Sequence, residues 1–100
     1  MMATKGYANV WDALLDSPEE AINMQLRSKL MMECTDVVQS WSVSQKEAAK
    51  RLSITQPRLN DLLNGKIQKF SIDALVNLLA KADMDVDVEV RPHQANLAHA

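Results

Sequence analysis

The most constraining feature of this chain is a pair of helix-starting signals placed eleven residues apart. Ser44, with Glu47 three residues later, is a capping box, in which the serine hydroxyl accepts a hydrogen bond from the first helical turn. Thr55 is a second capping residue, and Pro57 suits a first turn, where the backbone N–H needs no partner. Two helices are therefore predicted, one beginning at about Gln45 and the other directly after Thr55.

The connection between these helices is very short. Only about three residues, 53–55, remain between them, so the helices must cross steeply and cannot lie side by side. This is the geometry of a helix-turn-helix hairpin. The apolar residues at helical spacing are predicted to form its seam: Ala48, Ala49, Leu52, Leu59, Leu62 and Leu63. Gly65 is expected to end the second helix in a left-handed conformation.

Positive charge is concentrated on the same segment. Residues 44–70 contain six basic and two acidic residues, a net charge of +4, whereas the rest of the chain carries −6 and the whole chain −2. This segregation is typical of a surface that binds phosphate groups. The alternative is a solvated face on a hairpin used only for packing. Capping and charge together favour DNA binding.

Length and composition bound the class of protein. One hundred residues correspond to one domain with a small core, so further burial by dimerisation is expected. Neither a run of about 18 apolar residues nor a basic segment followed by an apolar one occurs, so we expect no membrane span, no secretory signal and a cytoplasmic location. The single cysteine, Cys34, is predicted to be a buried core thiol.

Three further helical segments are predicted outside the hairpin. One or two turns are indicated by an apolar cluster at helical spacing: Val10, Trp11, Leu14 and Leu15. Ser17 and Pro18 signal a long helix that runs to about Gln39. Its predicted buried stripe is Ile22, Leu26, Leu30, Met31, Cys34, Val37, Val38 and Trp41. The last helix opens at Ser71 and ends near Lys81.

Residues 84–90 alternate strictly between apolar and acidic side chains, the pattern of a half-buried strand. The apolar set is Met84, Val86, Val88 and Val90. A lone strand leaves both edges unpaired, so we expect it to pair with a second copy across a two-fold axis or with a strand of another protein. The acidic residues favour a basic partner, or serve only to keep one strand face soluble.

The sequence thus predicts a mainly α fold of five helices with a single C-terminal β-strand. Residues 1–8 are expected to be flexible, residues 9–91 to form the domain, and residues 92–100 to be a disordered tail.

No catalytic or metal-binding constellation is evident. His93 and His99 lie in the tail without a cysteine or carboxylate cluster at metal-ligand spacing, so neither a metal nor a cofactor is expected. Glycine occurs only at Gly6 and Gly65, which excludes a phosphate-cradling loop. We therefore expect a protein that is not an enzyme.

The hairpin and its flanks resemble a known family of regulators. The spacing of four residues matches the pattern of the Cro/cI-type, or XRE, helix-turn-helix family of bacterial and phage regulators. They are the polar entry residue Gln45, the small packing residue Ala49, the turn residue Ser53 and the apolar core residue Leu59. Over residues 9–91 the chain looks most similar to HigA-type antitoxins, through segments 45–49, 54–59, 62–66 and 70–75 and the acidic strand. The resemblance implies a five-helix Cro/cI-type domain that binds double-stranded DNA as a homodimer, on an inverted-repeat operator at the bacterial nucleoid.

The resemblance also implies roles for individual residues. Gln45 would hold a phosphate, and Gln56 would read a base, as a bidentate contact to adenine. The full base-reading set is Gln56, Pro57, Arg58 and Asn60, and the full phosphate set is Gln45, Lys46, Thr55, Lys66 and Lys69. Ser53 stands at a turn position where glycine is common, and a left-handed backbone there would cost serine about 1 kcal/mol.

The implied function is a sequence-specific repressor that autoregulates its operon as the antitoxin of a type II toxin–antitoxin pair. Its partner would be a small, basic, ribosome-dependent messenger-RNA endonuclease. This toxin would be bound by Trp11, Leu14 and Leu15 or by the acidic strand. Two alternatives stay open: a stand-alone phage-like or chromosomal repressor without a toxin, and a protein-interaction adaptor whose hairpin contacts no DNA.

Overall fold

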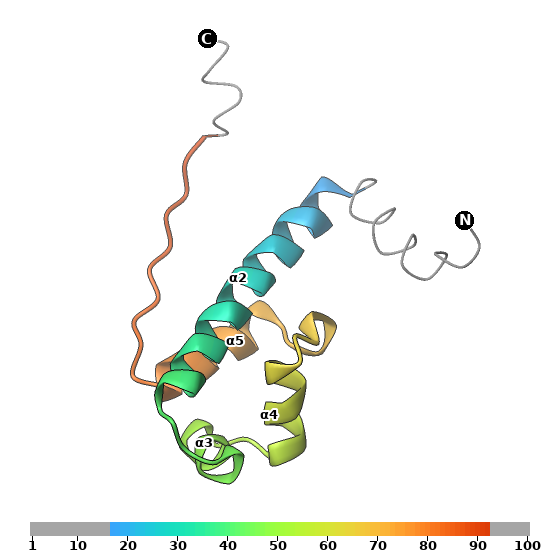
Figure 1. The fold of residues 1–100 in the computed structure, drawn as a ribbon. Helices are drawn as coiled ribbons and strands as arrows, with labels where there is room; N and C mark the ends of the chain where they lie inside the picture. The colour runs from blue at the N-terminus through green and yellow to red at the C-terminus, as the bar shows by residue number, and fades with distance from the viewer. Residues whose placement is uncertain (1–16, 93–100) are drawn as a thin grey trace, which may run out of the picture.

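The computed structural model describes residues 17–92, which form four α-helices and one 3-10 helix (Figure 1). In chain order they are α2 (Pro18–Ser40), α3 (Gln45–Leu52), α4 (Gln56–Leu63), η1 (Ile67–Lys69) and α5 (Ile72–Lys81). The predicted helical turns at residues 10–15, the predicted flexible residues 1–8 and residues 93–100 lie outside the described part. No helix within residues 17–92 is both long enough and apolar enough to cross a membrane.

Each described α-helix begins at the capping residue that the sequence predicts. A hydroxyl oxygen accepts the backbone N–H three residues later, at 3.1–3.3 Å, in Ser17, Ser44, Thr55 and Ser71. The carboxylate of Glu47 does not complete the predicted capping box and accepts a hydrogen bond from Arg51 Nε at 3.2 Å. The helix starts were therefore predictable from local hydrogen bonding alone.

Three helices end in the same left-handed motif. A residue at the C-cap or directly after it has a positive φ in each case: Ser53 (59°), Gly65 (72°) and Asp83 (62°). The N–H of the next residue then donates to the carbonyl oxygen five positions earlier, at 2.9–3.0 Å. This pattern satisfies carbonyl groups that a helix end otherwise leaves unpaired. The predicted ending at Gly65 is confirmed, and Ser53 does adopt the left-handed backbone.

The core lies where α2 and α5 pack on the hairpin (Figure 1). Its most deeply buried large side chains are Leu52, Leu59, Leu62, Phe70 and Leu75. The predicted seam is confirmed at five of its positions, which are buried, whereas Leu63 is half-buried. Cys34 is buried as predicted, with its Sγ 3.8 Å from the carbonyl oxygen of Leu75.

Only the second half of α2 contributes to this core. Leu30, Met31, Cys34 and Val38 are buried, but Ile22 and Leu26 are 66% and 43% exposed. The prediction that the whole stripe is buried is therefore wrong at its N-terminal end. The helix is 23 residues long, and its first half projects past the hairpin and α5 (Figure 1). An apolar strip on α2 is consequently left open to solvent.

The predicted C-terminal strand is not present in the described residues. Residues 84–90 follow α5 as an extended segment that runs away from the helices without forming a ladder (Figure 1). Val88 and Val90 are 82% and 89% exposed. A strand needs a neighbour for its backbone hydrogen bonds, and residues 17–83 offer only helices and loops. Over residues 17–92 the four predicted α-helices are therefore present and the predicted strand is not, while the fifth predicted helix, at residues 10–15, lies outside the described residues.

Candidate nucleic-acid interface

The first turn of α4 presents polar side chains to solvent. Leu59 and Leu62 anchor one face of this helix and are completely buried. Gln56 and Asn60, one turn apart, are exposed together with Pro57. Thr55 caps the helix through its hydroxyl oxygen, at 3.2 Å from the N–H of Arg58. The structure thus brings three of the four predicted base-reading residues to one accessible helix start.

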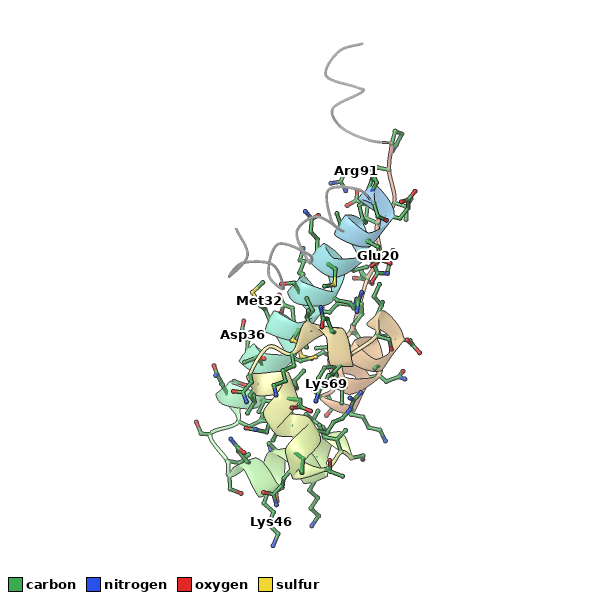
Figure 2. The ribbon with its side chains drawn as sticks, turned by 90° about the vertical axis from the view of Figure 1, so that its right-hand side faces the viewer. Glu20, Met32, Asp36, Lys46, Lys69 and Arg91 are labelled. Carbon is green, nitrogen blue, oxygen red and sulfur yellow. The ribbon has the colours of Figure 1, made fainter. Side chains whose placement is uncertain are left out.

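The first turn of α3 adds a second exposed polar surface. Gln45 and Lys46 are exposed, and Lys46 reaches outward at the end of the molecule formed by α3 and α4 (Figure 2). Lys50 is also exposed and lies one turn along the same helix. Lys50 is not among the predicted phosphate-binding residues, although its spacing of four from Lys46 places it on the same face.

The turn between α3 and α4 sets the relation of these two surfaces. Ser53 has φ 59° and ψ 41°, and the following Ile54 N–H donates to the carbonyl oxygen of Ala49 at 3.0 Å. Ala48 and Ala49 are buried where the helix backbones approach. The left-handed residue reverses the chain within three positions, so the start of α4 is held beside α3 by the main chain.

Arg58 is placed differently from the other predicted base-reading residues. Its guanidinium carbon lies 4.1 Å from the centroid of the Phe70 ring, a cation–π arrangement. Its Nη1 also donates to the carbonyl oxygen of Lys69 at 2.9 Å. The side chain is half-buried and ties α4 to η1. No sequence pattern indicated this contact, because Phe70 lies outside α4 and meets Arg58 only through the fold.

Lys66 and Lys69 lie beyond the end of α4 and share one carboxylate. Asp61 Oδ1 is 3.6 Å from Lys66 Nζ, and Asp61 Oδ2 is 3.5 Å from Lys69 Nζ. The structure thus pairs Asp61 with the two lysines of the predicted phosphate set.

Arg51 is the remaining basic residue of the hairpin, and it faces its own chain. Its guanidinium carbon lies 5.1 Å from the centroid of the Trp41 ring, and its Nε is 3.2 Å from Glu47 Oε2. The positive charge of residues 44–70 is therefore divided between structural contacts and exposed groups. The exposed cations among the described residues include Lys46 and Lys50 on α3 and Lys66 and Lys69 around η1.

The predicted partner segment after α5 lies apart from α3 and α4 (Figure 1). Met84, Val86, Val88 and Val90 are all exposed on the extended segment after α5. The predicted toxin-contact residues Trp11, Leu14 and Leu15 lie outside the described residues. Within residues 17–92 no three His, Cys, Asp or Glu side chains are grouped so that they could hold a metal ion.

This fold is similar to that of known proteins. A protein-family model described as a helix-turn-helix domain matches residues 13–91. A solved structure titled "Putative XRE Family Transcriptional Regulator" is 34% identical, with a TM-score of 0.69, and the match covers 74% of this chain and 83% of that chain. No curated protein matches the chain. The matched residues include the hairpin, both flanking helices and the extended segment, and the chain therefore belongs to the helix-turn-helix domain family, with a fold of the XRE type.

Proposed function

We propose that this protein is a sequence-specific DNA-binding transcriptional repressor. The observation that carries the proposal is the exposed polar start of α4, held against α3 by a tight left-handed turn. A helix presented in this way fits the major groove of B-DNA. The helix-turn-helix family and the XRE-family neighbour support a DNA-binding transcriptional regulator.

Individual contacts follow from the placement of the side chains. Gln56 and Asn60 reach outward from one face of α4 and would read base edges, while Pro57 would pack beside a base. Gln45, Lys46 and Thr55 stand at the starts of α3 and α4 and would bind phosphate groups on the flanking backbone. Arg58 would act mainly by holding η1 and its lysines in place, since its guanidinium is already engaged with Phe70.

The extended segment 84–90 would make the protein a homodimer. Its exposed apolar residues and free backbone groups would be covered if the segment paired antiparallel with that of a second copy. Two reading helices related by a two-fold axis would contact half-sites about 34 Å apart. An inverted-repeat operator is therefore expected.

A finer form of the proposal is that this repressor is the antitoxin of a toxin–antitoxin pair. The residues whose sequence resembles HigA-type antitoxins include the hairpin and the acidic segment. Asp85, Asp87 and Glu89 suit a basic ribonuclease, because opposite charge speeds association and favours the correct partner. Co-expression with the neighbouring gene product should give a complex and relieve growth arrest. A stand-alone repressor would show neither effect, and no toxin gene would adjoin it.

DNA binding is tested first with the purified full-length chain. Fluorescence anisotropy would compare its own upstream promoter duplex with a scrambled duplex of the same composition at two salt concentrations. We expect tighter binding to the promoter and a loss of affinity for both duplexes as salt rises, because phosphate contacts release counterions. Absence of DNA binding at both salt concentrations would instead support an adaptor that contacts only proteins.

A further inference from the structure

Two lysines of the predicted phosphate set are already paired with a carboxylate of their own chain. Asp61 offers one oxygen to each ammonium group, at 3.6 Å for Lys66 and 3.5 Å for Lys69. The lysine side chains are 51% and 56% exposed, whereas that of Asp61 is 22% exposed. The ammonium groups therefore form the outer layer of the cluster, where an incoming anion would meet them first.

The main chain brings these three residues together. The N–H of Lys66 donates to the carbonyl oxygen of Asp61 at 3.0 Å, as part of the left-handed ending of α4. The N–H of Lys69 donates to the carbonyl oxygen of Lys66, also at 3.0 Å, and Arg58 binds the carbonyl of Lys69. Backbone bonds and Arg58 thus hold the η1 loop beside Asp61 without help from its carboxylate.

The ion pairs themselves are loose. A charge-assisted N–H···O bond between ionised groups spans about 2.7–2.9 Å, which is shorter than either contact here. Ion pairs whose ammonium groups are this exposed stabilise a fold only modestly, because water screens them and the long lysine side chains must be held still. The lysines can therefore exchange this carboxylate for another oxyanion at small cost.

We propose that Asp61 is an internal competitor for DNA phosphate. In the free protein its carboxylate occupies the ammonium groups of Lys66 and Lys69, and a phosphate must displace it before these lysines contribute to binding. The inference rests on the proposed DNA-binding function. Because phosphate contacts carry no sequence information, Asp61 lowers affinity for all DNA alike and limits retention on non-operator sites.

The variant Asp61→Asn tests this, because it keeps the side-chain size and removes the charge. Binding of the full chain to promoter and scrambled duplexes is measured by fluorescence anisotropy at two salt concentrations. We expect affinity to rise by about threefold to tenfold on both duplexes, with a smaller gain at higher salt. Glu20→Gln removes the same charge near the opposite end of the molecule from Lys46 and should change affinity by less than about twofold (Figure 2).

A competitor must act through the lysines. In a Lys66→Gln, Lys69→Gln background, Asp61→Asn should therefore produce almost no further gain. A gain of full size in that background would mean general charge repulsion and would overturn the proposal. Reduced affinity of Asp61→Asn in the wild-type background would overturn it too, because Asp61 would then be positioning the lysines for DNA.

Two further measurements keep the test decisive. Thermal unfolding of each variant establishes that it is folded, and Asp61→Ser removes the same charge with a different side chain and should reproduce the gain. If the wild-type chain binds no DNA, the proposed function fails and the competition fails with it. If the wild-type chain binds its promoter specifically while both Asp61 variants match its affinity, only the competition is refuted.

Discussion

Single residues in strained or buried positions decide how the hairpin is held. Ser53 provides the left-handed turn that positions α4, although it carries a Cβ that disfavours this backbone. Cys34 lies in the core beneath α5, where its thiol must stay neutral. Gln56, by contrast, is exposed in the first turn of α4, where its side chain is accessible to a ligand.

Replacing Ser53 by glycine should stabilise the fold. Glycine adopts φ 59° without steric cost, so we expect the free energy of unfolding to rise by about 1 kcal/mol. Urea unfolding followed by circular dichroism measures the change. Ser53→Ala serves as the control, since alanine keeps the Cβ and should give no gain. A lower midpoint for Ser53→Gly would mean that the hydroxyl matters more than the backbone.

The thiol of Cys34 predicts a pH dependence. Burial, with a smaller contribution from the nearby Glu33 carboxylate, raises the pKa of Cys34 from 9.0 to about 11. Above pH 9 the unfolded chain loses this proton while the folded chain keeps it, so the stability falls as pH rises from about 9 to about 11. Cys34→Ala should show a shallower fall over the same range in urea-unfolding measurements. Identical slopes for the two proteins would contradict the burial of a neutral thiol.

Single substitutions should distinguish base reading from phosphate binding. Gln56→Ala should relax preference at one base pair by about 1–3 kcal/mol, because a bidentate contact is lost there. Lys66→Ala should weaken binding to all sequences and reduce the salt slope by about one. Titrations of a set of single-base-substituted duplexes distinguish the two. An equal loss on every duplex for Gln56→Ala would remove it from the reading role.

At the scale of elements, α4 and η1 behave as one unit. The left-handed ending at Gly65 turns the chain, and Arg58 then joins the two elements through Phe70 and the carbonyl of Lys69. The orientation of the lysines around η1 therefore depends on a residue inside α4. Sequence spacing alone placed Arg58 with Gln56 and Asn60, since all three belong to the same helix.

Arg58→Gln should therefore behave as a structural variant. Loss of the cation–π contact and of a hydrogen bond from a charged donor is expected to cost about 1–3 kcal/mol of stability. DNA affinity should fall on promoter and scrambled duplexes by a similar factor, because the lysines rather than the base contacts are disturbed. Unfolding midpoints and anisotropy measure the two effects. A selective loss at one base pair with unchanged stability would restore Arg58 to base reading.

At the scale of the whole molecule, apolar surface remains uncovered at both ends of the described chain. The first half of α2 leaves Ile22 and Leu26 open, and the segment after α5 leaves Val88 and Val90 almost fully exposed. Exposed apolar patches are typical of surfaces that bind another protein. Assembly with another protein chain is thus expected to bury apolar side chains that a single copy leaves exposed.

The double variant Val86→Lys, Val88→Lys should disrupt this assembly. Like charges facing each other across a two-fold axis would repel, so the dimer expected for the wild-type chain should become a monomer. Sedimentation equilibrium gives the mass directly. Asp85→Asn, Asp87→Asn, on the other face of the segment, changes the net charge by the same amount and is the matched control for charge. A wild-type monomer at micromolar concentration would contradict pairing between copies and favour a heterologous partner.

The sequence by itself determined the helix starts and the helix ending that depend on local interactions. Helix starts at Ser17, Ser44, Thr55 and Ser71, and the ending at Gly65, were predictable because capping hydrogen bonds and backbone preferences act within a few residues. The position of the first turn of α4 followed from the same signals. Tertiary structure alone decided which carboxylate meets which lysine, because those contacts depend on where η1 returns to α4.

The tertiary structure also decided how far burial extends. Periodicity gave α2 one continuous apolar stripe, but a stripe is buried only where another element reaches it, and α5 covers only the second half. The alternation of residues 84–90 likewise describes a strand that requires a neighbouring edge. The hydrophobic period and composition of a segment determine which side chains it can bury. The lengths and crossing angles of the neighbouring helices determine which of them are buried.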